Sequence, residues 1–440
     1  MSVSRRELIS GALISGALVG CGPLANRAIP NGAEVLTRKP LQTPTDRVVN
    51  RLAFGPSEAL LAELNDRGIE GYIQGQLTSE ATREPALAVR LRHLEALELE
   101  AAELTDLPED EVLRQLQAAS IISAAYSAHQ LHERMVDFWS NHFNIYARKE
   151  RGAYRVAVDQ RSTIRKHALG SFTDLLLASA RSTAMLVYLD NQLNSQAGPN
   201  ENYARELMEL HTLGVNGGYT QHDVKEVARC FTGWSMENRL LRPRGRFRFD
   251  ESKHDSGSKV VLGKRLPADG GEKDGMAVLE LLATHDKTAE FITGKLCRYF
   301  LGHVEPNVHQ EASRAFLESK GDIRATLKPI LTKDRLSAGE PIIKRPFDLA
   351  VSAIRSLGAS TDGGKGLQRH LEAMGQPLFQ WPMPDGFPDH TGAWAGSLLP
   401  RWNFALALLK GEISGTVVEA DPTQQEDFAF RLCSPEFQWR

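Results

Sequence analysis

Acidic and basic side chains gather in one short stretch near the middle of the chain, residues 200–214, which reads NENYARELMELHTLG. On a helix, Glu201, Arg205 and Glu209 lie at i, i+4 and i+8, and Glu206 shares the neighbouring face with Glu209. Acids held beside an arginine on a rigid helix could bind a metal ion or perform acid–base catalysis. We expect the positive charge of Arg205 to keep these acids ionised. The alternative is a ladder of salt bridges with a structural role.

A second polar segment contains the pair His254-Asp255, with Lys259 close by. Imidazole, carboxylate and ammonium groups together suit the binding of an anion or a metal, or proton transfer. The alternative is an ordinary solvated turn. We hypothesise that His254 and Asp255 reach the same cleft as Glu206 and Glu209, because separate segments must converge to make a site. A separation above about 15 Å would exclude this shared site, since no single ligand shell spans that distance.

Four further side chains are candidates for substrate binding. Arg229 and Trp234 lie near the end of the next predicted helix, and Lys259 follows the His-Asp pair. Trp381 lies in a proline-rich stretch, residues 380–389, that could hold an aromatic face for stacking against a sugar ring or another flat ligand. The alternative is that the tryptophans of this region pack the loop onto the helical core.

The N-terminus has the pattern of an export signal. Arg5 and Arg6 are followed by a short apolar run, and Cys21 ends a lipobox, LVGC. The run is too short to cross a membrane but suits the core of a twin-arginine signal peptide. We therefore predict export to the periplasm or outer membrane, removal of residues 1–20, and lipidation of Cys21 as a membrane anchor. Residues 21–42, with several prolines and little periodicity, are predicted to form a tether.

The remaining chain, residues 43–440, has the pattern of a large multi-helix body. Apolar residues recur at spacings of three and four over most of its length. The exception is 235–270, where the alternating segment 246–249 and the β-branched run 259–262 predict a small hairpin. The predicted fold class is therefore mainly α, with a β-hairpin insertion around 235–270. Helices are predicted to begin at Thr43-Pro44 and to cover 58–64, 69–77, 85–105, 108–142, 151–167, 171–181, 200–213, 221–231, 274–301, 309–318, 321–332, 345–357, 366–374 and 397–411.

Composition limits the classes of function. The 440 residues include 52 Lys and Arg against 55 Asp and Glu, and this net charge of −3 argues against a nucleic-acid partner. The 4 cysteines are too few for a disulfide framework. With Cys21 lipidated, a disulfide among Cys230, Cys297 and Cys433 is left open. The sequence lacks the motifs of the common serine hydrolases, zinc proteases and nucleotide-binding enzymes.

A set of short segments invites comparison with a known family: 134–143, 188–191, 200–214, 219–234, 254–255, 259–263, 344–346 and 435–438. Together they resemble the bacterial "domain of unknown function 1800" family from about residue 45 to the C-terminus. Its members are typically exported and are often encoded beside a second exported family, so the resemblance implies a sulfatase-like or phosphatase-like partner protein. The family pattern accepts Phe at the place of His211, which argues against this histidine as an obligatory ligand. The resemblance brings no reaction with it.

Two functions remain open at this point. One is an exported envelope lipoprotein with hydrolytic or metal-assisted enzyme activity on an envelope or extracellular substrate; a divalent metal would be the cofactor in the metal-assisted case. The other is a non-catalytic binding or scaffold lipoprotein that partners another exported protein. The several polar segments, and an export route that carries folded proteins, favour the enzyme.

Overall fold

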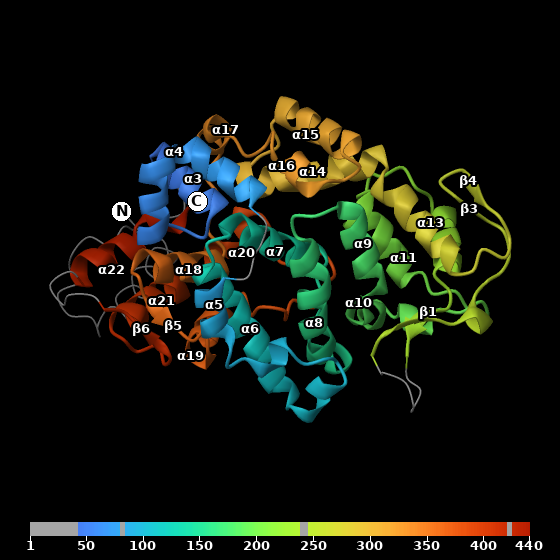
Figure 1. Ribbon diagram of the computed structural model, residues 1–440, viewed down its shortest axis with the longest axis horizontal. Coiled ribbons are helices and arrows are strands. Elements are labelled where there is room, and N and C mark those ends of the chain that lie inside the picture. Colours follow the sequence, from blue (N-terminus) through green and yellow to red (C-terminus); the bar gives the residue numbers. More distant parts are fainter. Residues whose placement is uncertain (1–42, 80–83, 238–244, 420–424) are drawn as a thin grey trace, which may run out of the picture.

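The computed structural model describes residues 43–79, 84–237, 245–419 and 425–440 (Figure 1). In these ranges the chain is mainly helical, which confirms the predicted fold class. No helix in the same ranges is long and apolar enough to cross a membrane. The predicted signal peptide, the lipidation site Cys21 and the tether lie outside the described residues.

Short connections join successive helices. The first part of the chain contains α3 (Pro44–Leu52), α4 (Glu58–Thr78), α5 (Pro85–Leu91), α6 (Glu109–Tyr126), α7 (Gln130–His142) and α8 (Ala153–Asp159). The middle contains the π-helix η5 (Gln160–Arg165), α9 (Phe172–Arg181), α10 (Thr183–Tyr188), α11 (Asn202–Glu206), the π-helix η7 (Leu207–Thr212), α12 (Gln221–Cys230), α13 (Glu272–Ala283) and α14 (Asp286–Leu301). The last part contains α15 (Pro306–Glu318), α16 (Ile323–Leu327), α17 (Lys333–Ala338), α18 (Pro346–Ser356), α19 (Lys365–Ala373), α20 (Thr391–Trp394), α21 (Leu398–Leu409), α22 (Gln425–Cys433) and α23 (Pro435–Gln438).

The strands form small antiparallel pairs at the periphery. They are β1 (Trp234–Met236) with β2 (Phe247–Phe249), β3 (Lys259–Val261) with β4 (Lys264–Leu266), and β5 (Ser360–Thr361) with β6 (Thr416–Val417). The β insertion predicted around 235–270 is therefore present, but the predicted pairing of 246–249 with 259–262 is wrong. Leu262 and Gly263 both have positive φ, 48° and 75°, and this two-residue turn pairs β3 with the strand that follows it.

The single helix predicted over 108–142 is wrong, because the chain turns at Ser127 between α6 and α7. The Ser127 hydroxyl and the N–H of Ala128 both donate to the carboxylate of Glu84, at 2.6 Å each. The side-chain amide of Gln130 donates to the carbonyl of Ser127 at 2.8 Å. These partners satisfy the groups that a helix end exposes, so the turn requires neither proline nor glycine.

Two other predicted helices are also interrupted. The segment 274–301 is divided between α13 and α14, where Nδ1 of His285 accepts the N–H of Lys287 at 3.0 Å and starts the second helix. The segment 85–105 is helical only over α5 and then continues in short 3-10 turns, η2 (Glu95–Leu97) and η3 (Glu103–Asp106).

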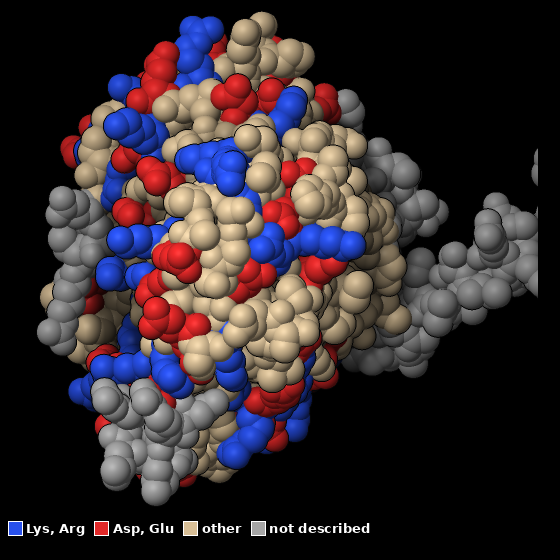
Figure 2. All heavy atoms as spheres, turned by 90° about the vertical axis from the view of Figure 1, so that its right-hand side faces the viewer, with Lys and Arg blue, Asp and Glu red and all other residues tan. Residues whose placement is uncertain are grey.

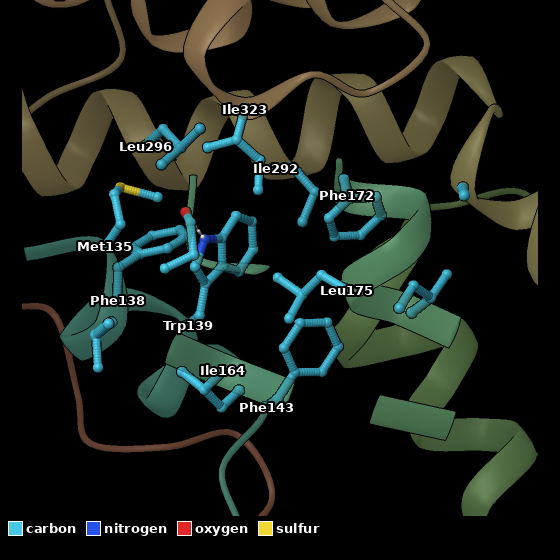
Figure 3. Close-up of a cluster of buried hydrophobic side chains, with 14 of the residues drawn as sticks. Met135, Phe138, Trp139, Phe143, Ile164, Phe172, Leu175, Ile292, Leu296 and Ile323 are labelled. Atoms are coloured by element: carbon cyan, nitrogen blue, oxygen red, sulfur yellow. Dashed lines mark hydrogen bonds between the residues drawn. The ribbon is translucent and has the colours of Figure 1, made fainter. Parts of the chain in front are cut away.

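Helix α7 lies at the centre of the main hydrophobic core (Figure 3). Its side chains Met135, Phe138 and Trp139 pack among residues of α9 and α14, and the indole N–H of Trp139 donates to the carbonyl of Ala168 at 3.0 Å. A second hydrophobic cluster forms around α18 and α21. The first cluster fixes the position of the C-terminal end of α7, which carries His142.

Candidate functional site

The acidic stretch forms two kinds of helix. α11 ends at Glu206, and the chain then winds as the π-helix η7. Backbone N–H groups in a π-helix bond five residues back instead of four, so its turn is wider. The stretch is therefore not one regular α-helix: Arg205 lies in its α-helical part, with Glu201 at the N-terminal end, and Glu209 lies in the π-helix.

Glu201 and Arg205 form an ion pair near the surface. Nη2 of Arg205 lies 3.1 Å from Oε2 of Glu201 and 2.9 Å from Oε1 of Gln221, and the Arg205 side chain is 40% exposed. The amide of Gln221 also donates to Glu201. Because Gln221 begins α12, these contacts join the acidic helix to the next one, which is a structural role.

Glu206 is only partly exposed and lies among other acids. Burial raises its pKa, Glu209 and Asp385 raise it further, and Arg205 opposes them without prevailing. Arg205 therefore does not bring the pKa of Glu206 below its ordinary value, and the ionisation of this acid stays a prediction. In the described ranges, no group of three or more His, Cys, Asp or Glu side chains is placed to hold a metal ion, so the acidic helix offers no metal centre there.

His254 belongs to a buried polar network. Its Nδ1 lies 2.8 Å from the carbonyl oxygen of Thr232, and its Nε2 lies 3.2 Å from Oδ2 of Asp274. Nζ of Lys259 donates to the same Asp274 oxygen at 2.6 Å, and the Lys259 side chain is 0% exposed. The three groups satisfy one another, so Lys259 offers no surface to a substrate.

Asp255 and Arg229 hold the loop before β3 against α12. Nε and Nη2 of Arg229 donate to the two carboxylate oxygens of Asp255, at 2.7 and 3.0 Å. Nη1 of Arg229 donates to Glu226 at 2.8 Å, and the other oxygen of Glu226 accepts the N–H of Val260 at 2.8 Å. This bidentate pair has the geometry of a strong structural link.

Trp234 is completely buried, at 0% exposure, and contacts Phe231 and Phe247 edge to face. A ligand cannot stack on it, so its prediction as a substrate contact is wrong. In the described chain the side chains of His254 and Asp255 form hydrogen bonds with Thr232, Asp274, Lys259, Arg229 and Gly257, and not with Glu206 or Glu209. The shared site of the two polar segments stays a prediction without a contact to support it.

A cavity of about 400 Å³ lies elsewhere, between α7, α14 and the loop 380–394, which we call the aromatic loop. Of the predicted site residues, Trp381 alone lines it. Its wall is formed by Phe138, Asn141, His142, Leu210, Phe291, Lys295, Arg298, Tyr299, Ile342, Ile343, Arg345, Trp381, Asp385, Gly386, Phe387, Pro388, Asp389, His390, Trp394 and Arg440. The volume and the mixture of aromatic and charged walls are typical of a small-molecule site.

Two asparagines at the end of α7 fix the aromatic loop. Nδ2 of Asn141 donates to the carbonyl of Phe387 at 3.0 Å, and Oδ1 of Asn141 accepts the N–H of Phe387 at 2.7 Å. Asn144 donates to the carbonyls of Trp381 and Met383, at 3.0 and 2.7 Å. At Gly386 the φ angle is +78°, and a Cβ atom would lie 2.2 Å from the carbonyl oxygen of Asn141, so this close approach requires glycine.

Lys295 and His142 contact each other at the cavity wall. Nζ of Lys295 lies 3.0 Å from Nδ1 of His142, and Nε2 of His142 lies 3.1 Å from the carbonyl oxygen of His211. A carbonyl can only accept, so Nε2 of His142 carries the proton and Nδ1 accepts from Lys295. The His211 carbonyl belongs to the last turn of η7, where carbonyls have no partner within the helix. The acidic segment therefore orients the histidine that faces Lys295.

Burial sets the ionisation of this pair. It lowers the pKa of Lys295 to about 8, while Asp389 and Asp385 pull the pKa upward and Arg298 lowers it. Burial also holds the pKa of His142 well below its ordinary value, and the positive charge of Lys295 lowers it further. At neutral pH His142 is therefore a neutral acceptor, and Lys295 is an amine that loses its proton within a physiological range.

A cluster of buried charges borders the cavity where Arg345 and Arg440 line it, and we call this part of the wall the inner end of the cavity. Arg345 pairs with Asp137, and Arg134 pairs with Asp348. Arg440 lies over the ring of Tyr299, with 4.7 Å from its guanidinium carbon to the ring centroid. Burial alone would raise the pKa of Asp348, but Arg134, Arg440 and Arg345 outweigh it and hold that pKa well below its ordinary value.

Sequence reasoning missed Lys295, although a signal for it exists. Phe291, Lys295 and Tyr299 are spaced at i, i+4 and i+8 on α14, so a lysine lies between two aromatic residues on one helix face. All three line the cavity. His142 follows Phe138 and Trp139 on an apolar face of α7, a position typical of a hydrogen-bonded core histidine, and it is buried with a hydrogen bond to the His211 carbonyl.

Neither the cysteines nor the surface near the β insertion suggests another site. Cys230, Cys297 and Cys433 are free and buried, and burial raises the pKa of Cys297 to about 11. On the face shown in Figure 2, Lys and Arg side chains alternate with Asp and Glu, and no patch of one sign dominates. This mixture is consistent with the near-zero net charge and offers no polyanion-binding surface on that face.

The comparisons with known proteins identify a family. The model of a protein of unknown function, DUF1800, matches residues 47–438, nearly the whole chain. No curated protein and no solved structure shows significant similarity to the chain.

Proposed function

The chain belongs to the DUF1800 family of proteins of unknown function, and we propose that it is an exported envelope enzyme whose active site is the aromatic-loop cavity. In this proposal the enzyme is hydrolytic and Lys295 is its general base. The observation that carries the proposal is the 3.0 Å contact between Nζ of Lys295 and Nδ1 of His142 at the cavity wall.

His142 positions the amine of Lys295 and leaves the lone pair of that amine free. Because Nδ1 of His142 can only accept, Lys295 directs an N–H toward it. A neutral Lys295 amine then keeps its lone pair for a group inside the cavity. With a pKa of about 8, the amine is neutral in a useful fraction near physiological pH, which is the condition for efficient general-base catalysis.

The proposed reaction is the hydrolysis of an ester. Lys295 takes a proton from a water molecule while the water oxygen bonds to the carbon, phosphorus or sulfur atom of the ester. The bond from that atom to the leaving oxygen breaks, and the leaving oxygen takes the proton from the Lys295 ammonium group. The aromatic walls at Trp381 and Trp394 exclude bulk water and orient the organic part of the substrate.

The location of the enzyme is part of the proposal. The Arg5-Arg6 pair and the lipobox at Cys21 support export by the twin-arginine route and a lipid anchor, with the 21–42 tether between anchor and enzyme. The substrate would then belong to the envelope or its surroundings. A sulfatase-like or phosphatase-like exported partner remains a proposal from the family resemblance.

Hydrolysis of chromogenic phosphate, sulfate and carboxylate esters by purified protein lacking residues 1–20 tests the proposal. We expect turnover to rise with pH with a midpoint near 8 and to fall by about 100-fold or more in Lys295→Met. Lys287→Met is the matched control, because Lys287 is an exposed lysine on the same helix, and it should leave the rate unchanged. A rate that survives Lys295→Met would contradict the proposal. The wild type and Lys295→Met could also both bind a ligand and both lack turnover. This result would favour the alternative, a non-catalytic binding lipoprotein.

A further inference from the structure

We propose that the inner end of the aromatic-loop cavity is a binding site for an oxyanion group, held by the guanidinium groups of Arg440 and Arg345. The ligand is then an organic molecule that carries a carboxylate, phosphate or sulfate group. This inference names the substrate class of the proposed enzyme and rests on the proposed function only in treating that ligand as a substrate. The anion site itself rests on the geometry of the inner end.

Arg440 has unused hydrogen-bond donors in the cavity wall. Its residue is 3% exposed, and its Nε and Nη1 have no hydrogen-bond partner in the described chain. The carboxylate in ion-pair range is Asp348, with 3.9 Å between Nε of Arg440 and Oδ2. The main-chain oxygen of Arg440 accepts the N–H of Ile342 at 2.9 Å, so it is engaged elsewhere. A buried guanidinium group with free donors is costly unless an anion reaches it.

The charges around Arg440 do not balance among the side chains of this cluster. Arg134 and Arg345 already pair with Asp348 and Asp137, respectively. Arg440 lies beside Asp348 as well, at 3.9 Å, and must share this carboxylate with Arg134, so the cluster holds more positive than negative side chains. One negative group at the inner end of the cavity would balance this charge.

The ring of Tyr299 packs against the guanidinium groups of Arg440 and Arg345 and limits their orientation. The guanidinium carbons of Arg440 and Arg345 lie 4.7 and 5.9 Å from the centroid of the Tyr299 ring. Nε of Arg345 makes no hydrogen bond in the described chain, although it lies 3.5 Å from Oδ2 of Asp348. Planar guanidinium donors held in this way match the oxygens of carboxylate, phosphate and sulfate groups. Lys295 precedes Tyr299 by one turn of α14, so an anion at Arg440 would place the body of its molecule beside Lys295.

Isothermal titration calorimetry with inorganic phosphate, sulfate and acetate, at constant ionic strength, tests this site on the chain lacking residues 1–20. We expect at least one of these anions to bind wild type, and Arg440→Gln to weaken that binding by about 30-fold or more, as for a lost buried charge contact. Arg298→Gln is the matched control, because Arg298 lines the outer part of the cavity and pairs with the exposed Asp389 at 3.4 Å. That variant should change the affinity by less than about threefold.

Two further measurements keep the test independent of folding and of catalysis. Without added anion, Arg440→Gln should melt at the wild-type temperature or higher, since an unbalanced buried charge is removed; clear destabilisation would identify Arg440 as a structural residue and overturn the inference. Lys295→Met should retain anion binding within about threefold, so loss of ester hydrolysis in that variant leaves the anion site standing. No binding of any of the three anions to wild type, or equal losses in the Arg440 and Arg298 variants, would overturn the inference.

Discussion

Nζ of Lys295 lies 3.0 Å from Nδ1 of His142, although 153 positions separate the two residues in the sequence. The other ring nitrogen of His142 is held by the carbonyl of His211, in the π-helix that follows the acidic helix. The acidic segment therefore contributes to the candidate site through its backbone. Its charged side chains lie outside the contact between lysine and histidine.

Replacement of Lys295 by Met should stabilise the fold, and the gain should depend on pH. Burial lowers the pKa of Lys295 from 10.5 to about 8 in the folded chain. Between these values the unfolded chain binds more protons than the folded chain, so the wild type gains stability as pH rises from about 8 to 10.5. The Met variant lacks this dependence and should be more stable by about 1–3 kcal/mol at pH 7, with the difference shrinking toward pH 10. Urea unfolding at the two pH values measures it, and an equal difference at both would contradict the assignment.

The buried network around His254 should prove structural. Asp274→Asn removes the charge that faces Nζ of Lys259, a fully buried ammonium group, and should cost about 3–5 kcal/mol of unfolding free energy. Glu209→Gln, at a partly exposed acid of the neighbouring polar segment, should cost less than about 1 kcal/mol. Denaturant titration of both variants tests the contrast. A stable Asp274→Asn variant would return His254 and Lys259 to the set of candidate ligand-binding residues.

The ion pair of Arg134 with Asp348 should be the most sensitive charged contact of the cavity's inner end. Both side chains are 1% exposed, so Asp348→Asn leaves a buried guanidinium group without its carboxylate and should cost about 3–5 kcal/mol. The exposed pair of Glu63 with Arg67 is the control, and Glu63→Gln should cost about 0.5 kcal/mol or less. Similar losses in the two variants would show that the inner cluster is open to water.

Export should depend on the paired arginines, and anchoring should depend on the cysteine. Arg5→Lys combined with Arg6→Lys should leave full-length protein in the cytoplasm, because the twin-arginine pattern is removed. Cys21→Ser should abolish acylation and release the protein from the membrane fraction. Cell fractionation with mass spectrometry of the N-terminus measures both effects. Membrane-bound protein that retains residues 1–20 intact would contradict the export signal.

Much of the helical fold could be predicted from local pattern. The predicted segments 171–181 and 221–231 match α9 and α12 to within a residue at either end, because apolar periodicity defines these short helices. The turn at Ser127 could not be predicted in the same way. It depends on the carboxylate of Glu84, which reaches the helix end from a distant part of the chain.

The candidate site was less accessible to sequence reasoning. Trp381 could be singled out because aromatic and proline residues gather around it, and it does line the cavity. His254 attracted a functional interpretation by its chemistry alone, yet its partners are buried and satisfied. Arg440 has no local motif, and Lys295 is marked only by the two aromatic residues on its helix face. Tertiary packing brings the two residues to one cavity.

The pH dependence of amine labelling at Lys295 tests the central claim most directly. Competitive acetylation of the folded protein at a series of pH values, read out by mass spectrometry of each lysine peptide, gives a titration midpoint for each amine. We predict a midpoint near 8 for Lys295, well below the ~10.4 of an ordinary lysine side chain. A midpoint for Lys295 near the ordinary ~10.4 would show that it is an ammonium group at neutral pH and would contradict its role as a general base.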